Sequence, residues 1–492
     1  MLYIGIDLGT SACKLLLVDS EGNVRNTVTR EYPISYPHPG WSEQSPEDWW
    51  RAVEEGVPEL LHGFDAGEVA GIGAGGQMHG LVALDENGAV IRPAILWNDS
   101  RTADEVRWLN EDVGRAYLSA HTANIAFAGF TAPKLLWMRA HEPQLFARIR
   151  SIMLPKDYIV YKLTGERASD YSDASGTLLL DVEHRRWSRE MCSLCGVEES
   201  WLPALHESFE RVGTLLPEAA ERLGLRKDVV VCAGAGDNAA AAVGTGAVGG
   251  GRCNISLGTS GTIFISSEKF GVDVHNALHS FAHADGGYHL MGCMLSAAAC
   301  NAWWQDGILR DGDYAAAQAA IGEEKLGRNR VFFLPYLMGE RSPINDTNAR
   351  GTFTGMTMDT TREDMTLAVL EGVTDEDRAE VRKLLAEKFC TCELVKGVEN
   401  LYIVAEVKAG GDSASVEIQG QHNNITKIVR NGTVVFEKRA DGVDSQESEG
   451  DEEAINLRSI IEFAGSAEIK DIEPILANQI KCNKAISEEG LC

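Results

Sequence analysis

Two short segments carry the residue types that hold a phosphate group in a tight turn. The sequence DLGTS at residues 7–11 and the sequence SLGTS at residues 256–260 each lie between two apolar segments. Backbone N–H groups of a glycine turn bind phosphate oxygens without long flexible side chains, and Thr and Ser hydroxyls add donors. The pattern predicts two nucleotide-binding turns, formed by Gly9, Thr10 and Ser11 and by Gly258, Thr259 and Ser260. The phosphate loop GxxxxGK(S/T) does not occur in the sequence.

Asp7 leads directly into the first turn. A carboxylate in this place can hold Mg²⁺ directly or through water, and the metal ion then offsets phosphate charge during transfer. We therefore predict a nucleoside triphosphate and Mg²⁺ as cofactors, with Asp7 as a metal-binding and catalytic residue.

A dinucleotide site is the competing interpretation of the glycine-rich segments. GIGAGG at residues 71–76 fits GxGxxG, and GAGDNA at residues 234–239 fits the same fingerprint between a strand and a helix. However, no acidic residue ends a strand about 20 residues after Gly234, where a ribose would be bound. The two phosphate turns are therefore the favoured interpretation.

Alternating and helical apolar patterns predict the elements that carry these residues. Residues 2–9, 13–19 and 24–32 are expected to form an antiparallel meander, residues 69–76 and 89–99 strands, and residues 45–61 and 132–149 helices, with Ser45 as a cap. From residue 229 a buried strand, a glycine turn, an Ala-rich helix and a second hairpin follow. The repeated hairpin predicts an α/β protein with two related domains facing each other across a cleft.

Composition limits the class of partner. The 492 residues carry a formal net charge of −28, which argues against nucleic acid and anionic membranes and favours a small-molecule ligand. The N-terminus shows neither a leader nor an apolar span, and the odd number of cysteines, 11, agrees with a cytoplasmic protein. Cys192 and Cys195 form a CxxC without a second pair at zinc spacing, so we expect packing cysteines.

Residues 1–373 resemble the FGGY sugar kinases and, among them, the bacterial xylulokinases. The likeness rests on motifs in this order: IGIDLGTS, PHPGWSEQSPEDWW, GGQMHG, RPAILWNDSR, GFTAPKLLW, LPKDY, TGERASDYSDASGT, GDNAAAAVGTG, SLGTSGT and FLPYLMGERSP. The resemblance implies the actin-like ATPase fold, which is ribonuclease H-like, with two domains. It also implies that ATP and Mg²⁺ are used to convert D-xylulose to D-xylulose 5-phosphate. The implied partners are a ketose and ATP, and the resemblance leaves a homodimer open.

The family pattern also assigns residues. Asp237 corresponds to the general base that takes the proton of the attacking hydroxyl, and Met78, His79 and Asn238 correspond to sugar contacts. Asp237 stands between glycines and an Ala-rich helix whose N-terminus is expected to keep the carboxylate ionised, although a simple helix cap would show the same pattern. His79 would be a structural residue in the alternative interpretation. Asp99 is expected to line the same sugar pocket.

Residues 374–492 resemble an internal stretch of the L-cysteine desulfidase and serine-dehydratase-like proteins, with a join near Val373. This interpretation gives three segments: residues 1–245 as the N-terminal kinase domain, residues 246–373 as a truncated second domain, and residues 374–492 as an α+β tail with an acidic loop at 441–453. The tail is expected to contain strands, a hairpin turn at AGGDSAS (409–415), another at Asn431-Gly432, and a terminal helix.

The predicted truncation removes part of the kinase pattern. The Gly-Gly-Gly-Ala segment that holds adenosine in these kinases is missing, and the shortened sheet is expected to expose open edges unless the tail packs there. A weakened or inactive sugar kinase is therefore the first hypothesis. A non-catalytic sugar-binding or chimeric protein is the alternative, and cysteine desulfidation by the tail is a third.

Overall fold

The computed structural model describes residues 1–273, 278–322, 325–326, 328–342, 344, 346, 349–385, 389–396, 401–408, 417–420, 426–430, 433–437 and 455–456. The chain forms two compact units. Unit 1 consists of residues 1–244 and 269–289, and unit 2 consists of residues 245–268 and 290–492. The sequence analysis placed a boundary at residue 245, but it did not foresee that residues 269–289 return to unit 1.

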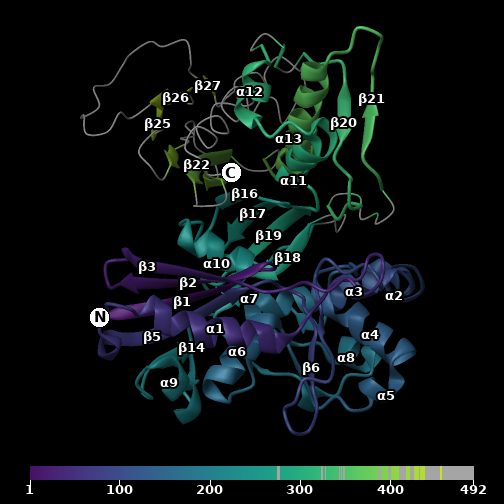
Figure 1. Cartoon of the computed structure of the whole chain (residues 1–492). Coiled ribbons are helices and arrows are strands. Elements are labelled where there is room, and N and C mark those ends of the chain that lie inside the picture. Colours follow the sequence, from purple (N-terminus) through teal and green to yellow (C-terminus); the bar gives the residue numbers. More distant parts are fainter. Residues whose placement is uncertain are drawn as a thin grey trace. The chain divides into compact units, whose positions relative to one another are not determined.

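Unit 1 is built on a mixed sheet of strand order β13-β14-β5-β1-β2-β3, with β15 also pairing with β5 (Figure 1). Its strands are β1 (Leu2–Leu8), β2 (Ala12–Asp19), β3 (Val24–Glu31), β5 (Val69–Gly76), β13 (Arg211–Thr214), β14 (Val230–Cys232) and β15 (Ala235–Gly236). The first three form the antiparallel meander predicted from the sequence. β1, β14 and β15 run parallel to β5, so these four strands end at the same edge.

Helices α1 (Pro46–Leu60), α6 (Pro155–Thr164) and α9 (Pro217–Leu223) contact one another and contribute side chains to the core beneath this sheet. α1 confirms the predicted helix, although Ser45 makes no side-chain capping bond. The predicted helix 132–149 is divided into α4 (Thr131–His141) and α5 (Pro143–Phe146). The reason is local, because Glu142 precedes a proline and leaves the helical region of backbone space.

The predicted strand 89–99 is largely wrong. Only Ala94–Ile95 (β7) is a strand, and it pairs with β4 (Glu43–Gln44). The other elements of unit 1 are α2 (Ala103–Arg107), α3 (Arg115–Thr122), α7 (Tyr171–Ala174), α8 (Arg189–Cys195), α10 (Asp237–Gly244), β6 (Val82–Leu84), β8 (Ser151–Met153), β9 (Ala168–Asp170), β10 (Leu180–Asp181), β11 (Arg186–Trp187), β12 (Ala204–His206) and β18 (His279–Ala282).

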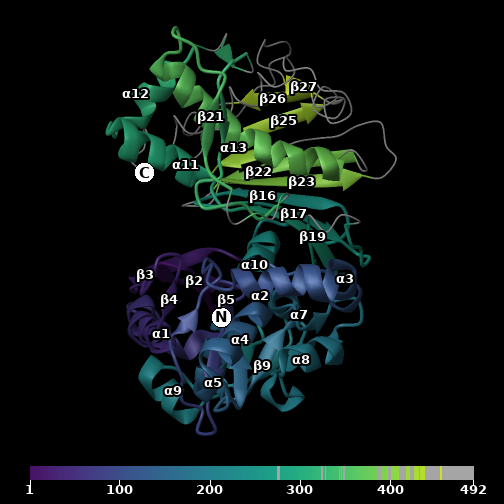
Figure 2. The same ribbon diagram turned by 90° about the vertical axis from the view of Figure 1, so that its right-hand side faces the viewer.

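Unit 2 contains the second predicted hairpin, and its sheet continues into the last quarter of the chain (Figure 2). The strand order is β19-β17-β16-β23-β22-β24-β25-β26-β27. The elements are β16 (Arg252–Leu257), β17 (Gly261–Ser267), β19 (Tyr288–Met294), α11 (Ala298–Ala302), α12 (Tyr314–Ala319), β20 (Phe332–Leu334), β21 (Thr352–Thr354), α13 (Arg362–Leu385), β22 (Phe389–Lys396), β23 (Leu401–Lys408), β24 (Glu417–Gly420), β25 (Thr426–Arg430), β26 (Thr433–Glu437) and β27 (Ile455–Asn456).

The predicted join and tail look different in the structure. α13 runs without interruption through Val373, and β23 pairs antiparallel with β16, so the tail packs on this sheet edge, which is the alternative that the sequence analysis left open. The expected hairpin around 409–415 is wrong, because β22 lies between β23 and β24. β25 and β26 pair around Asn431-Gly432 as predicted. Residues 409–416, the acidic loop 441–453 and the expected terminal helix lie outside the described residues.

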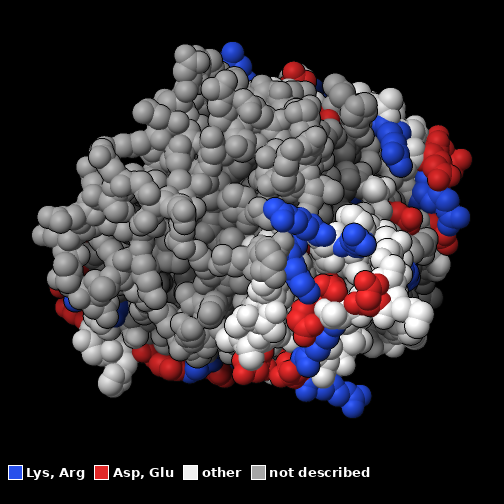
Figure 3. Space-filling view, turned by 90° about the horizontal axis from the view of Figure 1, so that it is seen from above, with Lys and Arg blue, Asp and Glu red and all other residues white. Residues whose placement is uncertain are grey.

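Charges of both signs share the surface. On the described part of the face in Figure 3, Lys and Arg side chains lie among Asp and Glu side chains. Among the helices of the described residues, none combines the length and apolar character needed to cross a membrane.

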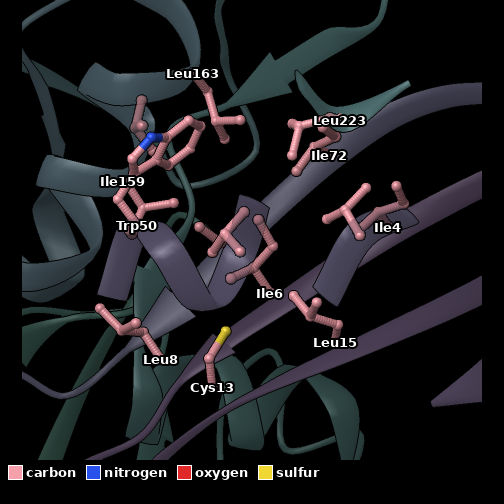
Figure 4. Close-up of a cluster of buried hydrophobic side chains, with 14 of the residues drawn as sticks. Ile4, Ile6, Leu8, Cys13, Leu15, Trp50, Ile72, Ile159, Leu163 and Leu223 are labelled. Atoms are coloured by element: carbon pink, nitrogen blue, oxygen red, sulfur yellow. The ribbon is translucent and has the colours of Figure 1, made fainter. Parts of the chain in front are cut away.

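The core of unit 1 lies on one face of β1 and β5. Ile4, Ile6 and Leu8 alternate along β1 and pack with residues of β2, β5, α1, α6 and α9 (Figure 4). Each of these three side chains is at most 2% exposed. Because side chains alternate along a strand, the burial of Ile6 and Leu8 directs Asp7 to the opposite face. Core packing therefore fixes the orientation of the first predicted catalytic residue.

Candidate active site

Asp7 and Asp237 lie at the edge where parallel strands of unit 1 end. Asp7 is in register with Gly75 of β5, and Gly75 is in register with Ala235 of β15. Asp237 follows β15 directly as the first residue of α10. The Asp7 charge acts on the Asp237 carboxyl, which shows that the two carboxylates are near each other. The structure thus brings together two residues that are 230 positions apart in the sequence.

Glycines of β5 leave room for close packing on this face of the sheet. A Cβ atom added to Gly75 would lie 3.2 Å from Cβ of Ala240 in α10, and one added to Gly73 would lie 3.3 Å from Sγ of Cys232. The segment GIGAGG is therefore a strand that allows a helix to approach closely. It is not the turn before a helix that a dinucleotide fingerprint requires, so the structure contradicts the dinucleotide interpretation of residues 71–76.

The Asp237 carboxyl is held by its neighbour and has an unusual pKa. The backbone N–H and the side-chain amide of Asn238 both donate to Oδ1, at 2.8 and 2.9 Å. Burial, followed by the nearby charge of Asp7, raises the pKa of Asp237 to about 7, and the two Asn238 bonds offset only part of this effect. Desolvation thus acts against the expectation that Asp237 is kept ionised.

Lys14 is a candidate residue that the sequence analysis missed. It is the direct cross-strand partner of Asp7 in the antiparallel pair of β1 and β2. Directly opposed residues share a face of the sheet, so Lys14 places a cation beside the Asp7 carboxylate. The sequence of the hairpin contains both residues, but the partner of Asp7 can be predicted only when the loop length is known. Leu8 pairs with Cys13, so residues 9–12 lie between the paired positions.

The first predicted phosphate turn is rigidly supported. The N–H of Gly9 donates to the Ala12 carbonyl at 3.0 Å and closes the hairpin. The sequence analysis predicted this N–H as a phosphate donor, but in the structure it serves the hairpin instead. The Thr10 hydroxyl accepts from Nε1 of Trp97 at 2.9 Å, and the Thr10 carbonyl accepts from Nε2 of Gln44 at 2.7 Å. Thr10 can still donate its hydroxyl proton. Thr10 and Ser11 are therefore the remaining candidates for phosphate donors in this turn.

The second predicted turn lies in unit 2 and has a shorter loop. Leu257 pairs with Gly261, so residues 258–260 form the loop, one residue fewer than in the first hairpin. The Gly258 N–H donates to the Ser260 carbonyl at 3.0 Å. The carbonyls of Gly258 and Thr259 accept from Ala298 and Ala297 at 2.8 and 2.9 Å, which fixes the start of α11 against the turn.

His79 and Met78, the predicted sugar contacts, are only 4% exposed each. Nδ1 of His79 lies 2.8 Å from the Gly176 carbonyl, and the ring stacks on Phe130. A carbonyl only accepts, so Nδ1 carries a proton and donates to it. His79 has a positive φ of 69°, and its carbonyl accepts from the fully buried ammonium of Lys134 at 2.8 Å. The ring and backbone are thus held from two sides.

Asp99 occupies a different environment from the predicted one. It is 2% exposed, and its oxygens accept from the Ser42 N–H at 2.6 Å and from Arg101 side-chain nitrogens at 2.8 and 2.6 Å. The Arg101 guanidinium in turn stacks over Trp41. This geometry favours a structural role for Asp99 over contact with a sugar.

The residues present fit a bound magnesium ion. Asp7 is an exposed carboxylate on the open face of β1, and Mg²⁺ is usually bound by one or two carboxylates together with substrate phosphates and water. A closed protein cage is not needed, and no group of three or more His, Cys, Asp or Glu residues suited to a metal ion occurs in the part of the chain that the structure describes.

Cys192 and Cys195 are buried free thiols, and burial raises the pKa of each to about 12.

Comparisons with known proteins show the family of the chain. The N-terminal and C-terminal domains of the FGGY family of carbohydrate kinases match residues 2–244 and 253–415. Xylulose kinase of Escherichia coli is 45% identical over 373 residues, 76% of each chain, and xylulose kinase of Bacillus subtilis is 38% identical over 374 residues, 75% of each chain. The crystal structure of a xyloylose kinase from Brucella ovis is 42% identical with a TM-score of 0.73, covering 78% of this chain and 79% of that one.

These matches also bear on the last quarter of the chain. The C-terminal family match extends well past Val373, and the expected likeness of residues 374–492 to L-cysteine desulfidases is not supported. The predicted fold is confirmed, since the solved relatives are sugar kinases with the actin-like two-domain ATPase fold. The chain belongs to the FGGY family of carbohydrate kinases.

Proposed function

We propose that this carbohydrate kinase transfers the γ-phosphoryl group of ATP to a hydroxyl group of D-xylulose. The observation that carries the proposal is the pair of carboxylates at one strand edge, Asp7 beside the first turn and Asp237 at the start of α10. The curated relatives from E. coli and B. subtilis, which this chain matches over most of their length, are xylulose kinases, and this supports the choice of ketose.

Asp237 is the proposed general base. Both Asn238 bonds fall on Oδ1, so Oδ2 is the oxygen that accepts the proton of the attacking sugar hydroxyl. As the O–H bond breaks, the sugar oxygen bonds to the γ-phosphorus, the bond from phosphorus to the β–γ bridging oxygen breaks, and ADP leaves. A base with a pKa of about 7 combines a useful ionised fraction with proton affinity at neutral pH.

Asp7, Thr10 and Ser11 are proposed to meet the phosphates. A bound Mg²⁺ held by Asp7 would supply charge neutralisation at the β- and γ-phosphoryl oxygens. Lys14, opposite Asp7, would add a fixed positive charge on the same face, and the turn hydroxyls would donate hydrogen bonds. In the second turn, where the Gly258 N–H bonds the Ser260 carbonyl, Thr259 and Ser260 of unit 2 are proposed as the phosphate contacts.

Met78, His79 and Asn238 are proposed to recognise the sugar. His79, whose Nδ1 donates to the Gly176 carbonyl, is proposed to contact a sugar hydroxyl with its ring, while Met78 supplies an apolar surface. Asp99 is proposed to support this region indirectly. A cytoplasmic location and a homodimer remain parts of the proposal.

The function is tested by ADP release from the purified chain with ATP, Mg²⁺ and D-xylulose, with D-ribulose and D-xylose as competing substrates. We expect turnover that requires D-xylulose and falls at least about 100-fold in Asp237→Asn, the usual range for loss of a general base. ADP release that does not depend on the sugar, or an Asp237→Asn variant with full kcat, would contradict the proposal. Calorimetric binding of D-xylulose without turnover would support the non-catalytic alternative.

A further inference from the structure

A fully buried group of four ionisable side chains lies beneath the proposed base. Lys156 and Asp157 begin α6, Asp170 ends β9, and Asp173 belongs to α7. Their side chains are at most 1% exposed. Burial of several charges is unfavourable unless they are paired and hydrogen-bonded, so such a group requires an explanation beyond packing.

Lys156 is the centre of this group. Its Nζ lies 2.6 Å from Oδ1 of Asp157, 2.9 Å from Oδ1 of Asp170 and 3.7 Å from Oδ2 of Asp173. Although burial acts to lower the pKa of Lys156, the three carboxylates raise it overall, so the ammonium is charged. Burial raises the pKa of Asp173 well above its usual value, and neither of its oxygens has a hydrogen-bond partner among the described residues. Asp170 is the carboxylate with the most bonds.

Asp170 is connected to the proposed base through one hydroxyl. Ser172 donates its hydroxyl proton to Oδ2 of Asp170 at 2.5 Å. The same hydroxyl oxygen accepts from the backbone N–H of Gly236 at 3.1 Å. Because the only proton of the hydroxyl is directed at the carboxylate, the oxygen can act only as an acceptor toward Gly236. The chain of bonds from Lys156 therefore ends at the Ala235–Gly236 peptide, one residue before Asp237.

The space around this connection is filled. A Cβ atom added to Gly236 would lie 2.9–3.0 Å from three atoms of Met78, and one added to Gly76 would lie 3.4 Å from Cβ of Lys156. The backbone that carries the base, the proposed sugar contact Met78 and the charged group therefore pack directly against one another. A shift of Ser172 or Asp170 cannot be absorbed without moving Gly236.

We propose that Lys156, Asp170 and Ser172 are positioning residues that fix the direction of the Asp237 carboxyl toward the attacking hydroxyl. The inference rests on the proposed role of Asp237 as general base and explains how that carboxyl is held. Lys156 orients Asp170, Asp170 orients the Ser172 hydroxyl, and this hydroxyl fixes the Gly236 peptide. The charge is needed because a carboxylate that receives an ammonium bond and two hydroxyl bonds has one orientation, whereas an apolar side chain would leave Ser172 free to rotate.

Ser208 provides a matched control within the same network. Its hydroxyl donates to the same oxygen, Oδ2 of Asp170, at 2.7 Å, and the described residues show no bond from this hydroxyl to Gly236. Ser208→Ala and Ser172→Ala therefore each remove one hydroxyl from the same carboxylate. Only Ser172→Ala also removes the acceptor of the Gly236 N–H. Ser172→Thr keeps the hydroxyl and serves as the conservative rescue.

The test measures kcat, KM for D-xylulose and the pH profile of kcat/KM in the three variants, together with hydrogen exchange of peptides covering residues 233–240. We expect Ser172→Ala to lower kcat about 10- to 100-fold with KM changed less than about threefold, since small misplacements of a catalytic group have effects of this size. Exchange at 233–240 should rise in this variant only. Ser208→Ala should lower kcat far less, and Ser172→Thr should recover most of it.

Equal losses in Ser172→Ala and Ser208→Ala would overturn the inference, because they would show a general effect on Asp170. Unchanged exchange at 233–240 in Ser172→Ala would overturn it as well, and this measurement decides even if the wild-type chain shows no turnover. Asp237→Asn, assayed beside them, distinguishes failure of the proposed function from failure of this inference. Full activity of Asp237→Asn would contradict the role of Asp237 as the base. An inactive Asp237→Asn together with a fully active Ser172→Ala would contradict only the positioning role.

Discussion

At the scale of single residues, the chemistry depends on neighbours that are distant in the sequence. The residue types around Asp7 predicted a phosphate turn, and the resemblance to the sugar kinases assigned the role of base to Asp237; both stay predictions. The pKa of Asp237 could not be predicted, because it is set by burial and by Asp7, which lies on another strand. Lys14 was missed for the same reason, since its pairing with Asp7 requires the hairpin register.

The raised pKa of Asp237 predicts how activity depends on pH. The base works only when deprotonated, and its pKa in the folded protein is about 7. We expect kcat/KM for D-xylulose to rise about tenfold per pH unit below 7 and to level off above it. Initial rates between pH 5.5 and 8.5 at constant ionic strength check this. A profile that is flat from pH 5.5 to 7 would show that the carboxyl has an ordinary pKa.

The same pKa predicts a change in stability. A carboxyl whose pKa is raised from 3.8 to about 7 by folding favours the folded state at low pH, and this contribution is lost as pH rises through 7. The ionised carboxylate therefore destabilises the folded protein at alkaline pH. Asp237→Asn should raise the melting temperature more at pH 8 than at pH 5, measured by calorimetry. An equal effect at both pH values would contradict the assignment.

At the scale of elements, strands with clear alternation were predicted well, and short or proline-containing segments were not. The meander β1 to β3, the strand β5 and the helix α1 are where the patterns placed them. The helix expected at 132–149 is divided at Glu142, and the strand expected at 89–99 shrinks to Ala94–Ile95. Both errors have the same origin, because the apolar pattern was extended across Pro143 and Pro93, where the backbone cannot continue its regular bonding.

The short 3₁₀ segment Ser175–Thr177 controls the His79 ring. A Cβ atom added to Gly176 would lie 2.3 Å from Nδ1 of His79, while the Gly176 carbonyl lies 2.8 Å from the same nitrogen. Gly176→Ala should therefore displace the ring and raise KM for D-xylulose at least about fivefold, the effect of one lost hydrogen bond of about 1 kcal/mol. Gly312→Ala, where an added Cβ meets nothing within 4 Å, is the control. Steady-state kinetics of both variants test this prediction. Equal KM values for D-xylulose would contradict the predicted contact between His79 and the sugar.

At the scale of the whole molecule, the resemblance to the FGGY kinases correctly predicted the two-domain kinase fold, but the pairing of the last quarter with β16 was not predicted. β23 begins almost 150 residues after the end of β16, and no local pattern reveals that the two strands pair. The predicted truncation assumed that residues 374–492 belong to another protein family. In the structure they supply strands to the sheet of unit 2.

This arrangement predicts the effect of shortening the chain. Ending it at residue 385 removes β22 and β23 and leaves the backbone of β16 without its partner, so we expect a lower melting temperature and aggregation. Ending it at residue 437 keeps β22 to β26 and should preserve the melting temperature within a few degrees. Thermal unfolding followed by light scattering compares the two products with the full chain. Identical behaviour of all three would show that β23 contributes nothing to the stability of unit 2.

The pairing of β16 with β23 has a consequence for encounters between copies of the protein in a crowded cell. A strand with unsatisfied N–H and C=O groups can act as a template on which foreign extended segments assemble into fibrils. Here the chain fills that position of its second sheet with a segment of its own, before any other polypeptide can occupy it. The last quarter of the chain therefore prevents the addition of foreign strands to β16.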